Sequence, residues 1–288
     1  MRRILITGGS GCLGAKFVEK YSDKFDISQI TRKNTKNEKQ NFVIDLSQNW
    51  SENSLPKEID VLILLAQERN YKNFPENAKD IFMVNVFSIF KLLEYARING
   101  IKKVIYASTG GLYDNTMESI TEESKIRNTS NLSLYFSTKI AAESLIGSYR
   151  PFFDVVIIRP FFIYGENQNL NSLFYNLKNR LINNIPIDLQ GEDGIKINPI
   201  YSGDAAAVLY NVVNSSHTGY INLAGNEIVT MRELATDMGS IIGKKPIFKI
   251  IEKNSDLIAD ISLVKKIMPN HQWTSLHTGL LMWLESSV

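Results

Sequence analysis

Residues 6–14 read Ile-Thr-Gly-Gly-Ser-Gly-Cys-Leu-Gly and place four glycines in nine positions. The apolar run at residues 4–6 predicts a buried strand before the glycines, and the periodicity after them predicts a helix. When a glycine-rich turn connects a strand to a following helix, backbone N–H groups and the helix N-terminus lie close together, and there they attract phosphate. The spacing Gly9-x-Gly11-x-x-Gly14 therefore predicts a dinucleotide-binding turn. A tight turn without a ligand is the alternative that this motif alone leaves open.

The first half of the chain alternates short apolar runs with longer amphipathic segments, which is typical of βαβ units around a parallel sheet. We predict strands at residues 4–6, 27–30, 41–44, 61–65, 103–107 and 155–159, and helices at 11–21, 79–99 and 134–148. The predicted fold class is therefore α/β, with a Rossmann-type doubly wound parallel sheet. Residues 1–160 form the predicted dinucleotide-binding domain, and its sheet also receives parts of residues 197–224.

The composition changes after Arg159, and residues 161–288 are predicted to form mainly a smaller C-terminal α/β substrate-binding region. In it we predict a helix at 173–183, a strand at 198–201 that leads into a helix ending at 213, a strand at 220–224, and helices at 231–242, 257–267 and 276–284.

The bulk composition is that of an ordinary globular chain, with 288 residues, 44% hydrophobic, 22% charged and a net charge of +2. This charge is too small to indicate nucleic acid or an anionic membrane as a partner. No apolar run approaches the about 18 residues that span a bilayer, and no cleavage-site pattern is visible, so we expect a cytoplasmic protein. The single Cys12 excludes a disulfide within the chain, and the three scattered histidines have no zinc-like spacing, so we expect no metal.

A second pattern lies in the middle of the chain, where residues 135–139 read Tyr-Phe-Ser-Thr-Lys. On the predicted helix Tyr135 and Lys139 share one face. A free tyrosine has a pKa of about 10, and a neighbouring ammonium stabilises the phenolate and brings this pKa toward the operating range. The pair is thus a candidate for acid–base chemistry, although two ordinary residues of a helix surface give the same pattern.

Two hydroxyl residues, Ser108 and Thr109, follow the predicted strand at 103–107. The strand ends at the edge where doubly wound sheets bind ligands, so both hydroxyls are candidate site residues. A turn or a helix cap is the alternative role for such a pair.

The glycines also read Thr7-Gly8-x-x-Gly11-x-x-Gly14, and in this form nearly the whole chain resembles the extended short-chain dehydrogenase/reductase family. This family contains NAD(P)-dependent nucleotide-sugar epimerases, dehydratases and reductases. The resemblance also gives Asn85 the place of the family's central asparagine. It implies that the cofactor contacts Gly8, Gly9, Ser10, Gly11, Cys12, Leu13, Gly14, Thr31, Arg32, Lys33, Asp45, Leu46, Leu65, Ala66, Tyr135 and Lys139.

The resemblance also implies catalytic roles for Thr109, Tyr135 and Lys139. Tyr135 exchanges a proton with a sugar hydroxyl or carbonyl, Thr109 hydrogen-bonds the same oxygen, and Lys139 activates Tyr135 and reaches the nicotinamide ribose. Ser108 takes a supporting place beside the substrate. A non-catalytic dinucleotide sensor, the alternative from another functional class, would have no need of this complete set.

Three departures from the family pattern narrow the expected function. Dehydratases carry an Asp-Glu pair after the threonine, where this chain has Gly110–Gly111, so a 4,6-dehydratase is not expected. Phe162 stands where the family usually has asparagine. Ile197 replaces an arginine that clamps the nucleotide diphosphate in many members. Either Lys196 or Arg180 supplies that contact, or the substrate is not the usual sugar nucleotide.

The third departure concerns the cofactor. NAD-binding members carry an acidic residue about 20 positions beyond the glycine turn, which binds the ribose 2′-hydroxyl. This chain has Thr31–Arg32–Lys33 there, so we expect a preference for NADP(H), with NAD(H) possible.

The expected reaction is an NADPH-dependent reduction of a nucleotide-linked 4-keto-6-deoxyhexose with Tyr135 as general acid. An NAD-dependent nucleotide-sugar epimerase, which returns the hydride to the other face of the sugar, is the alternative enzyme. The resemblance also implies a homodimer through the predicted helices at 79–99 and 134–148, which pair between subunits in many relatives. Both helices carry apolar residues beyond the side that faces the sheet, and the alternative is that all of these residues belong to the core.

Overall fold

The computed structural model describes residues 1–33, 41–114, 119–252 and 255–285. Within these residues a seven-stranded sheet has the order β11–β6–β5–β4–β1–β2–β3, and every neighbouring pair is parallel. Its strands are β1 (Arg2–Thr7), β2 (Phe25–Thr31), β3 (Asn41–Val43), β4 (Val61–Leu64), β5 (Lys103–Ala107), β6 (Asp154–Pro160) and β11 (Gly219–Leu223). The predicted doubly wound α/β fold is thus confirmed. The strand order reverses between β1 and β4, and such a reversal opens a ligand crevice at the carboxyl ends of the strands.

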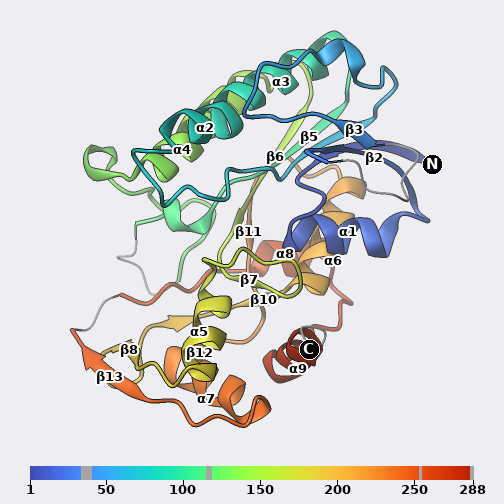
Figure 1. The fold of residues 1–288 in the computed structure, drawn as a ribbon. Coiled ribbons are helices and arrows are strands. Elements are labelled where there is room, and N and C mark those ends of the chain that lie inside the picture. The colour runs from blue at the N-terminus through green and yellow to red at the C-terminus, as the bar shows by residue number, and fades with distance from the viewer. Residues whose placement is uncertain (34–40, 115–118, 253–254, 286–288) are drawn as a thin grey trace.

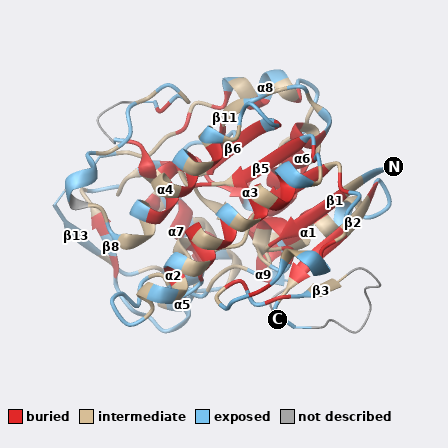
Figure 2. Ribbon diagram, turned by 90° about the horizontal axis from the view of Figure 1, so that it is seen from above, coloured by how far each residue is buried: buried red, intermediate tan, exposed pale blue. Residues whose placement is uncertain are grey.

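Helices cover both faces of this sheet (Figure 1). On one face lie α1 (Cys12–Tyr21), α6 (Ser202–Asn214) and α8 (Ser262–Ile267), and on the other lie α2 (Ala78–Phe82), α3 (Ser88–Ile98) and α4 (Leu134–Ser148). Side chains of β1 alternate between the two cores, with Ile4 and Ile6 in the first and Leu5 in the second. Because both faces are covered, all four residues of β4 are buried, and Figure 2 shows the sheet as a buried layer between the helices.

The C-terminal region packs around a third core, which lies below the sheet in Figure 1. Its helices are α5 (Leu173–Ile182), α7 (Met231–Ile241) and α9 (Leu276–Glu285). Its strands pair as β8 (Ile187–Gln190) with β13 (Phe248–Ile251), β7 (Ile163–Tyr164) with β10 (Ile200–Tyr201), and β9 (Lys196–Ile197) with β12 (Val229–Thr230). The chain leaves the sheet after β6 and returns to it with α6 and β11.

Several elements differ from the sequence predictions. The helix expected at 79–99 contains a π-helical turn, Met83–Phe87, between α2 and α3. Only Ser262–Ile267 of the helix expected at 257–267 is helical, because residues 257 and 259 form β-bridges with Ile197 and Ile120. The pair β8 and β13 was not predicted, since its partners lie about sixty residues apart in the sequence and each is short. Short 3-10 turns at Glu52–Ser54, Gly110–Leu112 and Thr129–Asn131 complete the elements.

No helix in the described part of the chain is both long enough and apolar enough to cross a lipid bilayer.

Candidate functional site

The glycine-rich turn between β1 and α1 leaves almost no room for side chains. Gly8 has a φ of +74°, and a Cβ on it would lie 2.7 Å from the Ala66 backbone nitrogen. A Cβ on Gly14 would lie 2.3 Å from the carbonyl oxygen of Gly8, so the helix can pack this closely on the strand only with glycine there. No side chain of the described residues caps the start of α1, so the first N–H groups of the helix are available to an anion.

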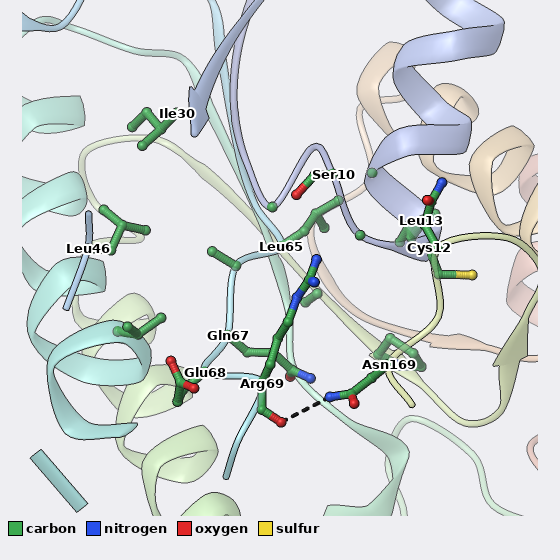
Figure 3. A pocket seen from close by; sticks show the side chains of 18 of the residues that line it. Ser10, Cys12, Leu13, Ile30, Leu46, Leu65, Gln67, Glu68, Arg69 and Asn169 are labelled. Atoms are coloured by element: carbon green, nitrogen blue, oxygen red, sulfur yellow. Dashed lines mark hydrogen bonds between the residues drawn. The ribbon is translucent and has the colours of Figure 1, made fainter. Parts of the chain in front are cut away.

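A pocket of about 360 Å³ opens over this turn (Figure 3), which is a size typical of small-molecule sites. It lies at the carboxyl ends of the central strands, as the reversal of strand order predicts. The predicted site residues that line it are Gly8, Ser10, Gly11, Cys12, Leu13, Gly14, Thr31, Arg32, Asp45, Leu46, Leu65, Ala66, Ser108, Thr109 and Tyr135.

Three predicted cofactor residues do not line this pocket. Gly9 packs against β2, where a Cβ would lie 2.0 Å from the side-chain oxygen of Gln29. Lys33 is exposed, and its carbonyl oxygen accepts a 3.0 Å hydrogen bond from the Thr31 hydroxyl. Lys139 is only 2% exposed and lies behind the pocket wall.

The donor set of the pocket fits a dinucleotide. The glycine turn and the start of α1 offer backbone N–H groups, which bind a diphosphate without side chains. The Ser108 hydroxyl oxygen is buried at the pocket wall and has no hydrogen-bond partner among the described residues. Since buried polar atoms are nearly always paired in folded proteins, this atom indicates that a ligand supplies the partner.

Thr109, Tyr135 and Lys139 lie around the end of β5. Tyr135 stands in the first turn of α4, and its hydroxyl donates a 3.3 Å hydrogen bond to the Gln67 side-chain oxygen. Thr109 begins the 3-10 turn that follows β5, and its hydroxyl oxygen accepts a 3.2 Å hydrogen bond from the Gly111 N–H. The arrangement brings two hydroxyls and one amine to a single edge of the sheet.

Burial governs the pKa values of the tyrosine and the lysine. It raises the pKa of the Tyr135 phenol, Tyr71 adds to this rise, and a hydrogen bond with Thr109 opposes it. Burial lowers the pKa of Lys139 to about 7, against the attraction of Glu143. The pKa of Tyr135 is therefore raised in this structure and not lowered as expected, because burial outweighs the hydrogen bond that opposes it.

Asn85 lies at the centre of the contacts behind the site. Its side chain is 2% exposed, donates a 3.1 Å hydrogen bond to the Thr138 hydroxyl and accepts a 3.0 Å hydrogen bond from the Glu68 N–H. It stands in the π-helical turn, a feature that is frequent at functional sites. Asn85 thus joins the loop after β4 to the helix that carries Tyr135.

Two phenyl rings lie against the glycines that follow Thr109. A Cβ on Gly110 would lie 2.5 Å from the ring of Phe161, and a Cβ on Gly111 would lie 2.8 Å from the ring of Phe136. Larger side chains at these two positions would need the rings to move. The space next to the threonine is therefore lined by apolar rings.

The other tentative substrate residues stand apart from the pocket. Arg180 donates to the Pro186 carbonyl, and its guanidinium lies 3.8 Å from the Asp188 carboxylate. Lys196 is exposed in β9. Phe162 packs against the core of the C-terminal region. Of the four tentative substrate residues, Ser108 is the one that lines the pocket.

The sequence interpretation missed five polar residues of the pocket wall. Figure 3 labels four of them, Gln67, Glu68, Arg69 and Asn169, and the fifth is Asn167. The Asn169 side-chain amide donates a 3.0 Å hydrogen bond to the Arg69 carbonyl and so joins the loop after β4 to the C-terminal region. The polar run Gln67–Glu68–Arg69, which begins three positions after the end of the buried strand β4, is the signal that could have indicated the first three of these residues.

The sequence model of the family described as "NAD dependent epimerase/dehydratase family" matches residues 4–224. Among curated proteins, the "Uncharacterized UDP-glucose epimerase YtcB" of Bacillus subtilis (strain 168) is 25% identical over 96% of this chain and 95% of its own. The dTDP-D-glucose 4,6-dehydratase of Mus musculus is 26% identical over 84% of this chain and 73% of its own.

Among solved structures, the UDP-glucuronic acid 4-epimerase from Bacillus cereus in complex with NAD superposes with a TM-score of 0.84. The superposition covers 98% of this chain and 95% of that chain at 20% sequence identity, and it shows that the two proteins share a fold.

Proposed function

The chain belongs to the NAD-dependent epimerase/dehydratase family, and from this premise we propose that it epimerises the C4 carbon of a nucleotide-linked hexose. One observation carries the proposal: Thr109 and Tyr135 line the same pocket as the glycine turn. A sugar hydroxyl can therefore meet a dinucleotide and an acid–base pair in one place. The names of the curated relatives add support, since both refer to a nucleotide-linked glucose.

In this proposal the glycine turn and the start of α1 hold the cofactor diphosphate, and Asp45 and Leu46 contact the adenine. Tyr135 contacts the ribose next to the nicotinamide. Lys139, which was expected at the same ribose, lies behind the pocket wall and supports Tyr135 from there. When bound, the cofactor supplies a reversible acceptor for the hydride of the sugar carbon.

The residues of this chain then transfer the proton of the reacting sugar hydroxyl. Thr109 donates a hydrogen bond to the reacting sugar oxygen, and Tyr135 exchanges a proton with it. Removal of the hydroxyl proton and the C4 hydride leaves a carbonyl at C4. The sugar ring then turns over in the pocket, and the hydride and the proton return to its opposite face, so the epimerisation involves no net oxidation. Lys139 stabilises the phenolate while Tyr135 lacks its proton.

The rings beside Thr109 favour epimerisation over dehydration. Removal of water from a sugar needs an additional acid and base, and relatives that do so carry Asp-Glu where this chain has Gly110–Gly111. Phe161 and Phe136 lie against these positions. An apolar wall cannot protonate a leaving hydroxyl.

A second candidate function is the NADPH-dependent reduction of a nucleotide-linked 4-keto sugar. Arg32 favours it, because this exposed cation lines the pocket at the end of β2, where an acid would select NAD(H). A preference for NADP(H) would serve a net reduction better than an epimerisation, which consumes no hydride.

We also propose a homodimer through α2, α3 and α4. Phe82 and Phe90 of this surface are 51% and 43% exposed, although they are large apolar side chains. Burial of these rings against a second copy would remove the exposure. A single species of 32.6 kDa in sedimentation at micromolar concentration would exclude the dimer.

The test of the proposed function is incubation of the protein with a panel of nucleotide-linked hexoses, with proton NMR of the products. The panel contains the nucleotide-linked forms of glucose, N-acetylglucosamine and glucuronate, each together with its C4 epimer. Interconversion of one pair supports the epimerase, and NADPH oxidation by a 4-keto sugar without interconversion supports the reductase. A protein that binds the dinucleotide but converts none of these sugars would be a sensor rather than an enzyme.

A further inference from the structure

A second tyrosine lies directly against the tyrosine of the site. The rings of Tyr71 and Tyr135 stack with their centroids 4.3 Å apart and their planes at 27°. Phe136 makes a more distant contact with Tyr135, with a centroid separation of 5.3 Å and tilted planes. Tyr135 lines the pocket, but Tyr71 does not, so Tyr71 contacts the ring from outside the pocket. Among the described residues, Tyr71 thus makes the tightest ring contact with Tyr135.

The loop that carries Tyr71 is held from both sides. On the side of the sheet, the Glu68 N–H donates to Asn85. On the side of the C-terminal region, Asn169 donates to the Arg69 carbonyl at 3.0 Å (Figure 3), and the Lys72 ammonium donates to the Asn171 carbonyl at 3.3 Å. Tyr71 therefore stands on a segment that is tied to both halves of the molecule.

The same loop also orients the hydroxyl of Tyr135. Gln67 accepts the phenol hydrogen at 3.3 Å, which directs the hydroxyl along the pocket wall. The stacked ring limits rotation of the phenol, and it removes water from one face of it. Burial, to which the stacked ring contributes, is the largest cause that raises the pKa of Tyr135.

We propose that Tyr71 is a positioning residue for Tyr135: its ring holds the phenol in the orientation that proton exchange needs and shields it from water. The inference rests on the proposed role of Tyr135 in catalysis. The aromatic ring of Tyr71 holds the phenol, because the stacking of the two rings needs no hydrogen bond from the Tyr71 hydroxyl. Tyr71→Phe should therefore behave like the natural protein, and Tyr71→Ala should not.

The first test does not depend on activity. Tyrosine nitration by tetranitromethane proceeds through the phenolate, and peptide mass spectrometry gives the nitration rate of Tyr135 separately from the other tyrosines. Loss of the ring exposes the Tyr135 phenol to water and so raises its phenolate fraction, and we expect nitration about tenfold faster in Tyr71→Ala. Tyr71→Phe and the control Tyr175→Ala, which removes an exposed tyrosine of α5, should match the natural protein. Equal rates in all four proteins would overturn the proposal.

The second test uses the sugar that the NMR panel identifies. Tyr71→Ala should lower kcat about 100-fold, as small misplacements of reacting groups do, with little change in KM. Its pH profile should shift toward lower pH, and Tyr71→Phe should restore both. A lower KM with unchanged or higher kcat in Tyr71→Ala would mean that Tyr71 occupies the place of the substrate, and it would overturn the proposal.

The two tests separate this inference from the proposed function. If no sugar reacts with the natural protein, the proposed function fails, and the nitration rates still decide whether Tyr71 shields Tyr135. If Tyr71→Ala loses its native circular dichroism, Tyr71→Leu replaces it in both measurements, because leucine retains an apolar side chain without the stacked ring.

Discussion

The Lys139 ammonium nitrogen donates a 2.8 Å hydrogen bond to the carbonyl oxygen of Ala107, the last residue of β5. Because Ser108 and Thr109 follow Ala107 directly, this bond ties α4 to the strand end that presents both hydroxyls. Glu143 ties the same helix to β6 through a buried ion pair with Arg159, at 2.6 Å. The position of Tyr135 thus depends on contacts of α4 with two neighbouring strands.

Tyr135→Phe should abolish most turnover and leave cofactor binding nearly intact. The variant keeps the ring and loses the hydroxyl that exchanges the proton, and such a loss lowers kcat by about 10²- to 10⁴-fold. Steady-state kinetics with the reactive sugar, together with calorimetric titration of the cofactor, measure the two effects. Full activity in this variant would remove Tyr135 from the mechanism.

Lys139 should make the stability of the cofactor-free protein depend on pH. Its pKa is lowered from 10.5 to about 7 by burial, so between these values the unfolded chain binds more protons than the folded protein. Stability should therefore rise with pH from about 7 to about 10.5, by at most about 1.4 kcal/mol per pH unit from this group. Urea unfolding of the natural protein and of Lys139→Met across this range measures the difference. Parallel pH dependences of the two proteins would show that Lys139 has no lowered pKa.

Glu143→Gln should destabilise the fold much more than the same change at an exposed pair. It leaves the Arg159 guanidinium buried without its carboxylate, although the rings of Tyr113 and Tyr220 still lie 4.6 and 4.2 Å from it. Breaking a buried pair costs about 3–5 kcal/mol of unfolding free energy. The control Glu58→Gln breaks an exposed pair with Arg3 and should cost less than about 1 kcal/mol. Similar urea midpoints for the two variants would contradict the assignment.

If Arg32 selects NADP(H), as the second candidate function requires, Arg32→Asp should reverse the preference to NAD(H). Arg32 lines the pocket at the end of β2, and a charged hydrogen bond to the 2′-phosphate of NADP(H) is worth roughly 1.5–3 kcal/mol. An aspartate at this place would accept a hydrogen bond from the 2′-hydroxyl of NAD(H) and repel the phosphate. Calorimetric titration with both cofactors compares the two proteins. If the natural protein binds NADP(H) no more tightly than NAD(H), the preference inferred from Arg32 is wrong.

Much of the fold could be predicted from local sequence patterns. The strands β1, β4 and β5 each contain a continuous apolar run, and the glycine turn has a spacing that depends on nearby residues alone. The hydroxyls of Ser108 and Thr109 follow a strand end, so their place at the sheet edge follows from the parallel topology.

The remaining features depend on contacts between distant segments. Asn85 lies in a π-helical turn, where it contacts Glu68 and Thr138. The periodicity of the helix does not predict that turn. Tyr71 reaches Tyr135 only because the loop after β4 folds back over α4. The pKa shifts of Tyr135 and Lys139 come mainly from burial, which is a property of the packed molecule, so the sequence suggested the wrong direction for the tyrosine.

The most direct test of the proposed epimerisation follows the hydride. A nucleotide-linked hexose with deuterium at C4 is incubated with the protein, and NMR and mass spectrometry give the configuration and the deuterium content at C4 of the product, while absorbance reports the nicotinamide. Epimerisation at C4 predicts an inverted C4 that retains its deuterium, with no net change in nicotinamide absorbance. Loss of the deuterium, or stoichiometric oxidation of NADPH by a 4-keto sugar without inversion of any hexose, would contradict it.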